Sequence, residues 1–208
     1  MADIRSALAD HAAPGRHGTP GQAPGVVLRE VSGAGLVQVA AWPDTVEAAM
    51  ARLAGLAGIA APETTRIATA GTDVTLFRLA PERFWIAGAA ADRLREAVAG
   101  AFAPEEAVVT DLGHSRTVLR VSGPEVRAFL ARSIAIDLDP AAFPLHSVAQ
   151  TALHHVGVLV HFAAGTPEGD AFDLYIPRSF ALSHWHWLTH LAEPFGYEVR
   201  EALAAASG

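Results

Sequence analysis

The sequence contains neither cysteine nor lysine. Without cysteine there is no disulfide, no thiolate ligand for zinc or an iron–sulfur cluster, and no cysteine nucleophile. Without lysine there is no Schiff-base amine and no phosphate-binding P-loop, whose motif requires one. All fifteen basic residues are therefore arginine, and the net charge is -7. Because the net charge is negative and no lysine-rich face exists to contact a phosphate backbone, we expect no nucleic acid partner.

Long hydrophobic runs are also missing. No stretch approaches the roughly 20 apolar residues that a membrane-spanning helix needs, and the N-terminus lacks the apolar segment of a secretory signal. We therefore expect a cytoplasmic protein with no membrane association. Hydrophobic residues make up 51% of the 208 residues and charged residues only 18%, so there is ample apolar material for a compact fold.

Residues 1–25 are rich in proline and glycine. Pro14, Pro20 and Pro24 alternate with glycines, a pattern that can hold neither a helix nor a strand ladder. We predict a flexible N-terminal arm over residues 1–25 that becomes ordered only against another surface.

From residue 26 onward, strand-like and helical patterns alternate. Apolar residues at helical spacing predict four helices, over residues 44–58, 91–102, 124–132 and 179–194. Short apolar runs bounded by glycine and proline predict antiparallel strands between them. The order indicates an α+β fold of two packed ferredoxin-like β-α-β-β modules, with helices covering antiparallel sheets. We place the modules at residues 26–106 and 107–208.

Motifs for cofactors and metals are weak. Gly33-Ala34-Gly35 precedes a strand and lacks the third glycine of a dinucleotide site. His186 and His190 share a helix face and could bind a metal, but the glutamate of the H-E-x-x-H motif is absent. A third ligand would have to be one of three histidines: His154, His155 or His161. Half-buried histidines that pack or donate hydrogen bonds are the simpler interpretation.

No catalytic constellation emerges either. A hydrolase triad drawn from Asp111, His114 and Ser115 or Ser122 lacks the G-x-S-x-G context, and adjacent residues cannot supply the mutual geometry. The acidic pairs Glu105-Glu106 and Asp137-Asp139 adjoin turn residues and resemble solvated loops and caps. We therefore predict no catalytic, cofactor-binding or metal-binding residue on this chain.

The last predicted helix carries apolar residues on more than one side. Trp185 and Trp187 point in different directions, because successive helical residues are separated by 100°. One side must pack on the chain's own sheet; the other is either buried too or is left for a partner, since tryptophan is enriched at interface centres. The candidate partner-interface residues are Arg178, His184, Trp185 and Trp187.

Four strings in order carry a family resemblance: RFWIAG at 83–88, TDLGHSRTVLRVSGPEVRAFL at 110–130, DLDPAAFPLHSVAQT at 137–151, and YIPRSFALSHWHWL at 175–188. From about residue 25 to residue 195 the chain resembles the gamma subunit of heterotetrameric sarcosine oxidase. That family is related to the folate-binding T-protein of glycine cleavage.

The resemblance implies a role inside a larger enzyme. In such an enzyme alpha, beta, gamma and delta subunits oxidise sarcosine with oxygen to glycine and hydrogen peroxide, and pass a one-carbon unit to tetrahydrofolate. It places FAD and FMN on or between alpha and beta, NAD on alpha, and zinc on delta. The gamma subunit is expected to carry none of them, and to dock on and stabilise alpha. The alternative is a stand-alone, folate-type small-molecule binder related to the T-protein.

The family strings also contain a polar cluster formed by Asp111, His114, Arg116 and Ser179. We favour a structural role, in which Asp111 pairs with Arg116, His114 shapes a turn and Ser179 caps the last helix. The functional alternative is that Arg116 and Arg178 reach an acidic patch on the partner, because guanidinium groups bind carboxylates bidentately.

Overall fold

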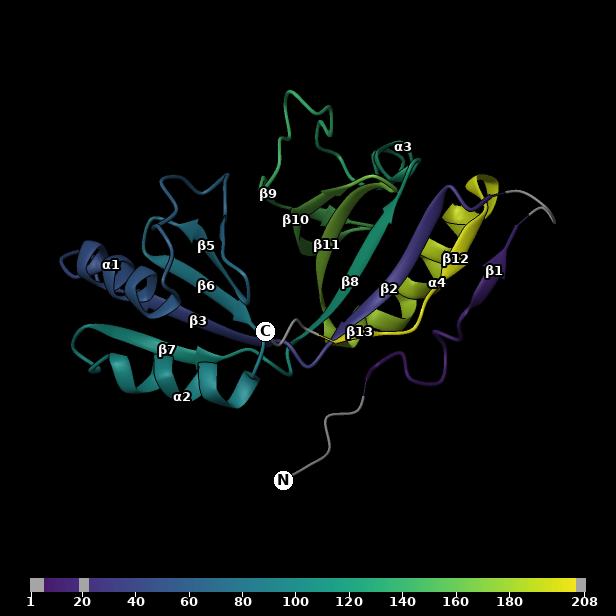
Figure 1. Ribbon diagram of the computed structural model, residues 1–208. Coiled ribbons are helices and arrows are strands. Elements are labelled where there is room, and N and C mark those ends of the chain that lie inside the picture. The colour runs from purple at the N-terminus through teal and green to yellow at the C-terminus, as the bar shows by residue number, and fades with distance from the viewer. Residues whose placement is uncertain (1–5, 19–22, 205–208) are drawn as a thin grey trace. The chain divides into compact units, whose positions relative to one another are not determined.

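The computed structural model describes residues 6–18 and 23–204. The chain forms two compact units (Figure 1). Residues 1–32 and 115–203 make up the first, which we call the split unit. Residues 33–114 make up the second, the inserted unit. In the described part of the chain no helix is long and apolar enough to cross a membrane.

The inserted unit is a five-stranded antiparallel sheet with two helices. Its strand order is β4-β5-β6-β3-β7. The strands are β3 (Gly35–Ala41), β4 (Thr69–Ala70), β5 (Val74–Ala80), β6 (Arg83–Gly88) and β7 (Ala107–Asp111). The helices are α1 (Val46–Ala57), which follows β3, and α2 (Ala91–Ala101), which follows β6.

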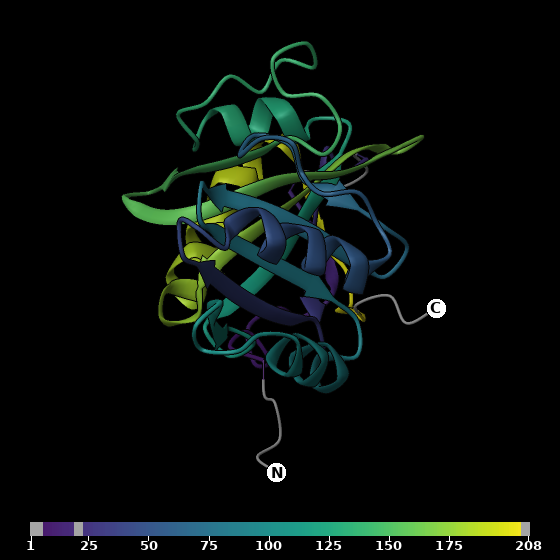
Figure 2. The ribbon, with the colours of Figure 1, turned by 90° about the vertical axis from the view of Figure 1, so that its left-hand side faces the viewer.

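Both helices cover the same face of this sheet (Figure 2). Alternate strand residues such as Val39, Phe84 and Ile86 point to that face and pack against Leu53 of α1 and Val98 of α2. All five are at most 1% exposed. Burial of these side chains, at roughly 1.5–3 kcal/mol each, is the main stabilising contribution within the unit.

The split unit is a larger sheet, ordered β1-β12-β2-β8-β11-β10-β9. Its strands are β1 (Gly15–His17), β2 (Val26–Ser32), β8 (Arg116–Gly123), β9 (Val148–Leu153), β10 (Val156–Thr166), β11 (Gly169–Pro177) and β12 (Tyr197–Val199), and β13 (Leu203–Ala204) adds to β2. β12 pairs with β2 in parallel, and β2 pairs with β8 antiparallel.

One face of this larger sheet is packed by helices. These are α3 (Val126–Ala131) and α4 (Ala181–Ala192), the latter flanked by the 3-10 turns η1 (Arg178–Phe180) and η2 (Glu193–Phe195). Leu28, Leu119 and Phe172 from three neighbouring strands meet Phe129 of α3 and Leu188 of α4, and all five are nearly inaccessible to water. We call the opposite side of the sheet the helix-free face.

The four predicted helices are confirmed, but the module boundaries differ from the prediction. Residues 26–32 were assigned to the first module, and residues 107–114 to the second. In the structure, residues 26–32 form β2 inside the sheet of the split unit, while β7 is an edge strand of the inserted unit. The reason is that β2 pairs with strands far away in the sequence, which a local pattern cannot reveal.

The N-terminal arm also differs from the prediction in its described residues. Leu8 is fully buried in the core of the split unit, and β1 pairs with β12. Ser6 donates a 2.5 Å hydrogen bond to Glu30. Two parts of the predicted flexible arm, residues 1–5 and 19–22, lie outside the described residues.

In the split unit three backbone segments lie in contact, at Gly25, Gly123 and Gly169, and their close approach requires glycine. Gly123 has φ of +120°, and a Cβ there would lie 2.5 Å from the carbonyl oxygen of Gly25. We predict that Gly123→Ala lowers the free energy of unfolding by about 3 kcal/mol, because strain and a backbone clash add. Gly55→Ala in α1, where a Cβ meets nothing within 4 Å, should raise it by about 1 kcal/mol. Urea denaturation measures both, and equal stability of the two variants contradicts the prediction.

Candidate partner-interaction site

Helix α4 divides the four candidate interface residues into two groups. His184 and Trp185 are 2% and 3% exposed and face the core of the split unit. The structure therefore corrects the expectation that both contribute to an interface. Trp187 and Arg178 are partly exposed. Packing of α4 against the sheet decides this division. The spacing of Trp185 and Trp187 in the sequence establishes only that their side chains point in different directions.

His184 connects the start of α4 to the sheet. Its Nδ1 lies 2.9 Å from the carbonyl oxygen of Phe180, and its Nε2 lies 2.9 Å from that of Leu153 at the end of β9. A neutral imidazole can donate to only one of these oxygens, and a doubly protonated ring can donate to both. Either way the side chain has a structural role, since both ring nitrogens are occupied by backbone groups.

Trp187 packs on the turn between β9 and β10. The ring of His154 stacks on its indole with centroids 4.9 Å apart. His154 and His155 have φ of 45° and 69°, so a two-residue turn of left-handed residues joins the strands. Such a turn favours glycine or asparagine, and two histidines there carry a backbone cost of about 1 kcal/mol or more each.

Exposed apolar side chains lie along the same helix. Phe180 is 45% exposed and Leu182 is 37% exposed. Phe180 and Trp187 are seven residues apart and share a side, whereas Leu182 lies about 140° around the helix from Trp187. We call Phe180 and Trp187, with the turn residues His154 and His155, the α4–turn surface. Large apolar groups exposed together next to aromatic stacking are typical of a protein-binding surface.

The residues of the predicted polar cluster are divided between the units: Asp111 and His114 belong to the inserted unit, Arg116 and Ser179 to the split unit. The backbone N–H of Gly113 donates to Asp111 at 2.8 Å, and Asp111 lies 3.8 Å from Arg95 of α2. Arg116 donates to the carbonyl oxygen of Ser115 at 3.1 Å, and burial lowers the pKa of Arg116. His114 lies in the turn of residues 113–115. The expected pairing of Asp111 with Arg116 stays a prediction.

Ser179 does not cap α4, contrary to the prediction. It lies inside η1, and the residue at the N-cap is Phe180, which makes no side-chain capping bond. Ser183 instead donates a hydrogen bond of 2.9 Å to the carbonyl oxygen of Phe180. The 3-10 turn itself satisfies one free N–H at this end, because the backbone N–H of Ala181 donates to the carbonyl oxygen of Arg178.

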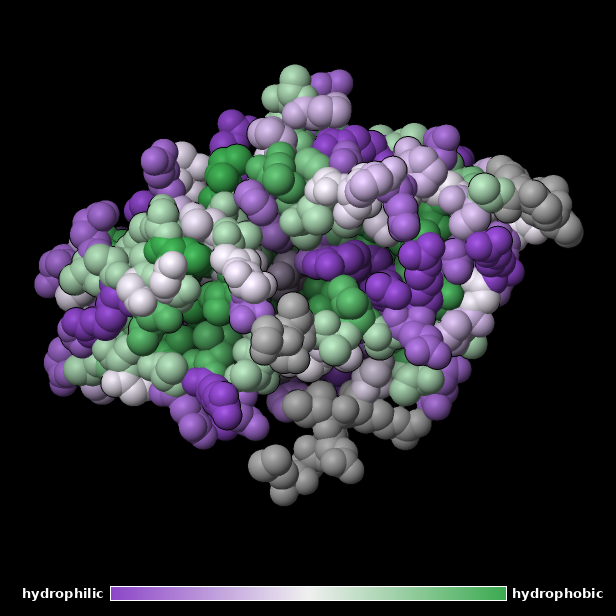
Figure 3. Space-filling view, viewed as in Figure 1, coloured by the Kyte–Doolittle hydropathy of each residue, from purple (hydrophilic) through white to green (hydrophobic). Residues whose placement is uncertain are grey.

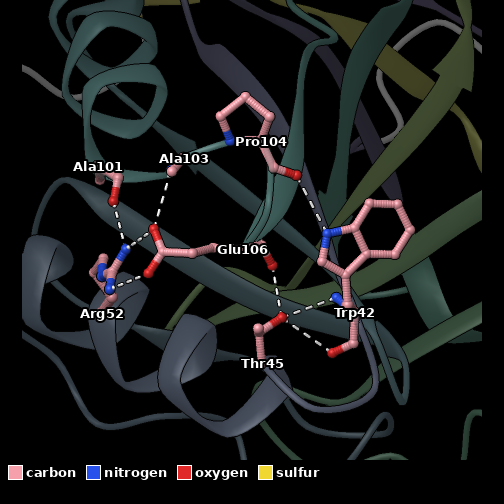
Figure 4. Close-up of polar contacts among 7 residues, drawn as sticks. All are labelled: Trp42, Thr45, Arg52, Ala101, Ala103, Pro104 and Glu106. Atoms are coloured by element: carbon pink, nitrogen blue, oxygen red, sulfur yellow. Dashed lines mark hydrogen bonds and ion pairs between the residues drawn. The ribbon is translucent and has the colours of Figure 1, made fainter.

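A second polar cluster closes one end of the inserted unit (Figure 4). Arg52 of α1 donates two hydrogen bonds of 2.7 Å to Glu106 and one of 2.7 Å to the carbonyl oxygen of Ala101. Glu106 also accepts the N–H of Ala103 at 3.0 Å. The guanidinium lies over the ring of Phe102, 5.2 Å from its centroid. Arg52 thus joins the end of α2 to α1.

Thr45 and Trp42 extend this cluster beyond β3 (Figure 4). The hydroxyl of Thr45 donates to the carbonyl oxygen of Glu106 at 2.6 Å and accepts the N–H of Trp42 at 3.0 Å. The indole of Trp42 donates to the carbonyl oxygen of Pro104 at 3.3 Å, although its side chain is 45% exposed. The sequence interpretation of Glu106 as a solvated loop or cap residue missed its pair with Arg52, because that partner is far away in the sequence.

The hydrogen bonds of Arg52 and Glu106 to the chain's own elements assign the cluster a structural role. Hydrogen bonds from Arg52, supported by the N–H of Ala103, lower the pKa of Glu106 to about 2. Such a carboxyl group stays ionised at neutral pH and is not suited to donate a proton in catalysis. The cluster fastens two helices and presents Trp42 at the surface.

The helix-free face of the split unit contains a further polar pair. Arg120 of β8 donates bidentately to Asp173 of β11, at 2.7 and 2.8 Å. His161 of β10 lies opposite Asp173 in the sheet, and burial lowers the pKa of His161 to about 4. Burial also raises the pKa of Tyr175. No local sequence pattern indicates this group, because only strand register brings its members together.

No metal centre emerges in the described ranges, which contain no group of three or more histidine, cysteine or acidic residues able to hold an ion. His186 contacts the ring of His11 with centroids 5.7 Å apart, and His190 lies 3.4 Å from Glu193. The two histidines therefore act as surface groups with separate neighbours.

Comparison with known proteins gives the family. The chain is 31% identical over 175 residues to sarcosine oxidase subunit gamma from Arthrobacter sp, an alignment that covers 81% of this chain and 83% of the relative. The chain belongs to the gamma-subunit family of sarcosine oxidase. It is 28% identical to the gamma subunit from Corynebacterium sp. strain P-1, over 94% of this chain and 93% of that subunit. Residues 64–205 match the family of the GCVT N-terminal domain.

Solved structures agree with this family. A chain of the heterotetrameric sarcosine oxidase from Corynebacterium sp. U-96, in complex with pyrrole 2-carboxylate, superposes with a TM-score of 0.78 at 25% identity. The superposition covers 92% of this chain and 96% of that chain. The glycine cleavage aminomethyltransferase T from Bartonella henselae shares the fold, with a TM-score of 0.61 at 16% identity over 86% of this chain and 48% of that one.

The Arg52–Glu106 pair predicts an acid-dependent loss of stability. The lowered pKa means that the folded state binds the proton more weakly than the unfolded state, so the contribution of Glu106 is complete above the unfolded pKa near 4.3 and disappears as the pH falls toward 2. Glu106→Gln should melt below the parent at pH 6, and the gap should close near pH 2. The control, Glu105→Gln, removes the same charge from an exposed neighbour and should change little. A gap that does not vary with pH contradicts the assignment.

The two tryptophans of α4 predict opposite mutational effects. Trp185→Ala should lower the free energy of unfolding by roughly 3–5 kcal/mol, because it opens a cavity in the core. Trp187→Ala removes a partly exposed side chain and should cost only about 1 kcal/mol. Chemical denaturation of the isolated chain measures both. If Trp187→Ala proves as destabilising as Trp185→Ala, Trp187 belongs to the core and not to the α4–turn surface.

Proposed function

We propose that this chain is a noncatalytic subunit of a heterotetrameric sarcosine oxidase, and that it docks on the alpha subunit and stabilises it. The observation that carries the proposal is the family assignment over nearly the whole chain, including 92% coverage against a chain of a heterotetrameric enzyme. The polar clusters described above point the same way, because their charged groups are used to fasten the chain's own elements. A subunit of this kind acts through its surface.

The α4–turn surface is the proposed docking site. It combines an aromatic group with an exposed apolar neighbour, and Arg178 at the start of the helix supplies a polar edge. Stable protein interfaces have such a desolvated apolar centre and bury on the order of 1,600 Å² in total.

In this proposal the chemistry belongs to the other subunits. They would hold FAD, FMN, NAD and zinc, and convert sarcosine to glycine and hydrogen peroxide in the cytoplasm while a one-carbon unit passes to tetrahydrofolate. The present chain would hold no cofactor. A second candidate, a folate-type binder, is favoured by the match to the GCVT domain family. Titration of the isolated chain with a reduced folate separates the two.

We also propose a ferredoxin-like plan for both units. In the inserted unit β3, α1, β5, β6, α2 and β7 follow one another, and the sheet order β5-β6-β3-β7 is that of such a module. In the split unit β8, α3, β10, β11, α4 and β12 repeat the plan, except that β2 lies between β8 and β12.

Co-expression with the alpha subunit encoded in the same genome tests the docking proposal. The chain should co-purify with alpha, and Trp187→Ala should weaken the complex by about 2 kcal/mol or more while its own melting changes little. Leu56→Ala, at a residue of α1 that is 46% exposed, is the control and should bind normally. Failure of the parent chain to co-purify contradicts the subunit role. Normal binding by Trp187→Ala removes the α4–turn surface from it.

A further inference from the structure

A row of charged side chains crosses the helix-free face of the split unit. Arg29 of β2 lies directly opposite Arg120 of β8, which in turn lies opposite Asp173 of β11. On the other side of β2, Leu28 pairs with Val199 and its carbonyl oxygen accepts the N–H of Arg200. Arg200 is therefore the neighbour of Arg29 along the row. Three arginines therefore stand side by side, two on the adjacent strands β2 and β8 and the third directly after the end of β12.

The two outer arginines of this row have acidic partners within the chain. Arg120 is held bidentately by Asp173. Arg200 lies 3.3 Å from Glu198 and 3.8 Å from Glu168. In both cases a carboxylate balances the guanidinium charge.

Arg29, in the middle, has no such partner. Across the part of the chain that the structure describes, it forms no ion pair, and its Nε is buried without a hydrogen-bond acceptor. The side chain as a whole is partly exposed, so the group remains within reach of another molecule. A buried polar atom without a partner is uncommon in native proteins and points to a missing one.

The arrangement costs folding energy. Like charges directly opposite each other on antiparallel strands repel, and partial burial removes water that would screen them. No neighbour of Arg29 within the row relieves this repulsion, because the positions on both sides of it are arginines. The chain as a whole has a net charge of -7, so three adjacent arginines are a marked local departure.

We propose that Arg29 binds a carboxylate from an acidic segment of the partner subunit. The Arg120–Asp173 pair one strand away shows how a carboxylate meets a guanidinium on this face, and planar guanidinium and carboxylate groups match each other with two hydrogen bonds. This inference rests on the proposed subunit role.

The shape of the surface favours a protein over a small molecule. The row lies on the face of a sheet, and in Figure 3 hydrophilic residues gather as a broad band over β8, β2 and β12. Small ligands bind mostly in concave, largely apolar pockets, whereas extended charged surfaces meet complementary charges of a partner protein.

The experiment measures the affinity of the purified chain for the same alpha subunit, at low and at high ionic strength. Arg29→Gln should weaken binding roughly tenfold at low salt, and should reduce the loss of affinity on adding salt. Arg29→Lys should fall between the parent and Arg29→Gln, because it keeps the charge without the planar fork. The control is Arg93→Gln, which removes one charge from an exposed position of α2 and should bind like the parent.

Melting of the isolated variants separates docking from folding. Arg29→Gln should melt at the same temperature as the parent or higher, since it relieves repulsion with Arg120. A lower melting temperature makes Arg29 a structural residue and overturns the inference. Binding by Arg29→Gln that equals the parent at both salt concentrations overturns it too.

A small carboxylate tests the choice of ligand. Titration of the isolated chain with succinate, followed through the guanidinium Nε–H signals by NMR, should give no saturable shift. Tight binding of succinate that Arg29→Gln abolishes assigns the site to a free metabolite instead, and contradicts the inference. Failure of the unmodified chain to bind alpha at all is a different result, because it removes the proposed subunit role itself.

Discussion

The pairing of β2 with β8 constrains the rest of the fold. Val31 near the end of β2 lies opposite Val118 near the start of β8, so the chain leaves one strand and re-enters its neighbour at the same end of the sheet. Everything between, residues 33–114, forms a unit with its own sheet, helices and core. The inserted unit is in effect the loop of a very long hairpin, and a loop that folds by itself adds little strain to the strands that hold it.

Local sequence patterns were sufficient for the helices and most strands. The apolar spacing of α1 and the glycine at 58, which adopts φ of 65°, mark that helix clearly. The same local patterns were insufficient to predict how the chain divides into two units. The segment 26–32 precedes a strand of the inserted unit along the chain, yet it pairs with β8 and β12. Nothing within a window of neighbouring residues encodes a partner so far away.

The candidate site shows the same limit at the level of side chains. Helical geometry established that Trp185 and Trp187 diverge, but only packing against the sheet shows that Trp185 is the buried one. The left-handed turn at His154 and His155 gave no signal, because histidine is an unusual choice there. Arg29 and Arg120 look unremarkable in the sequence, and strand register alone makes them opposite neighbours. The four family strings predicted the family correctly although local patterns missed these tertiary contacts, because a family resemblance depends on the sequence of the whole fold.

The position of β12 has a consequence for biosynthesis. This strand, near the end of the chain, is held between β1 and β2, which come from its beginning. On the ribosome β2 emerges early and can pair with β8 once residue 123 has appeared, but β1 and the other edge of β2 must wait for β12 until nearly the whole polypeptide has been released. The contiguous residues 33–114 can meanwhile fold as they appear. Nascent chains of this protein should therefore expose an incomplete sheet with an unpaired strand edge throughout synthesis. Chaperones that bind such surfaces should engage its N-terminal strands first.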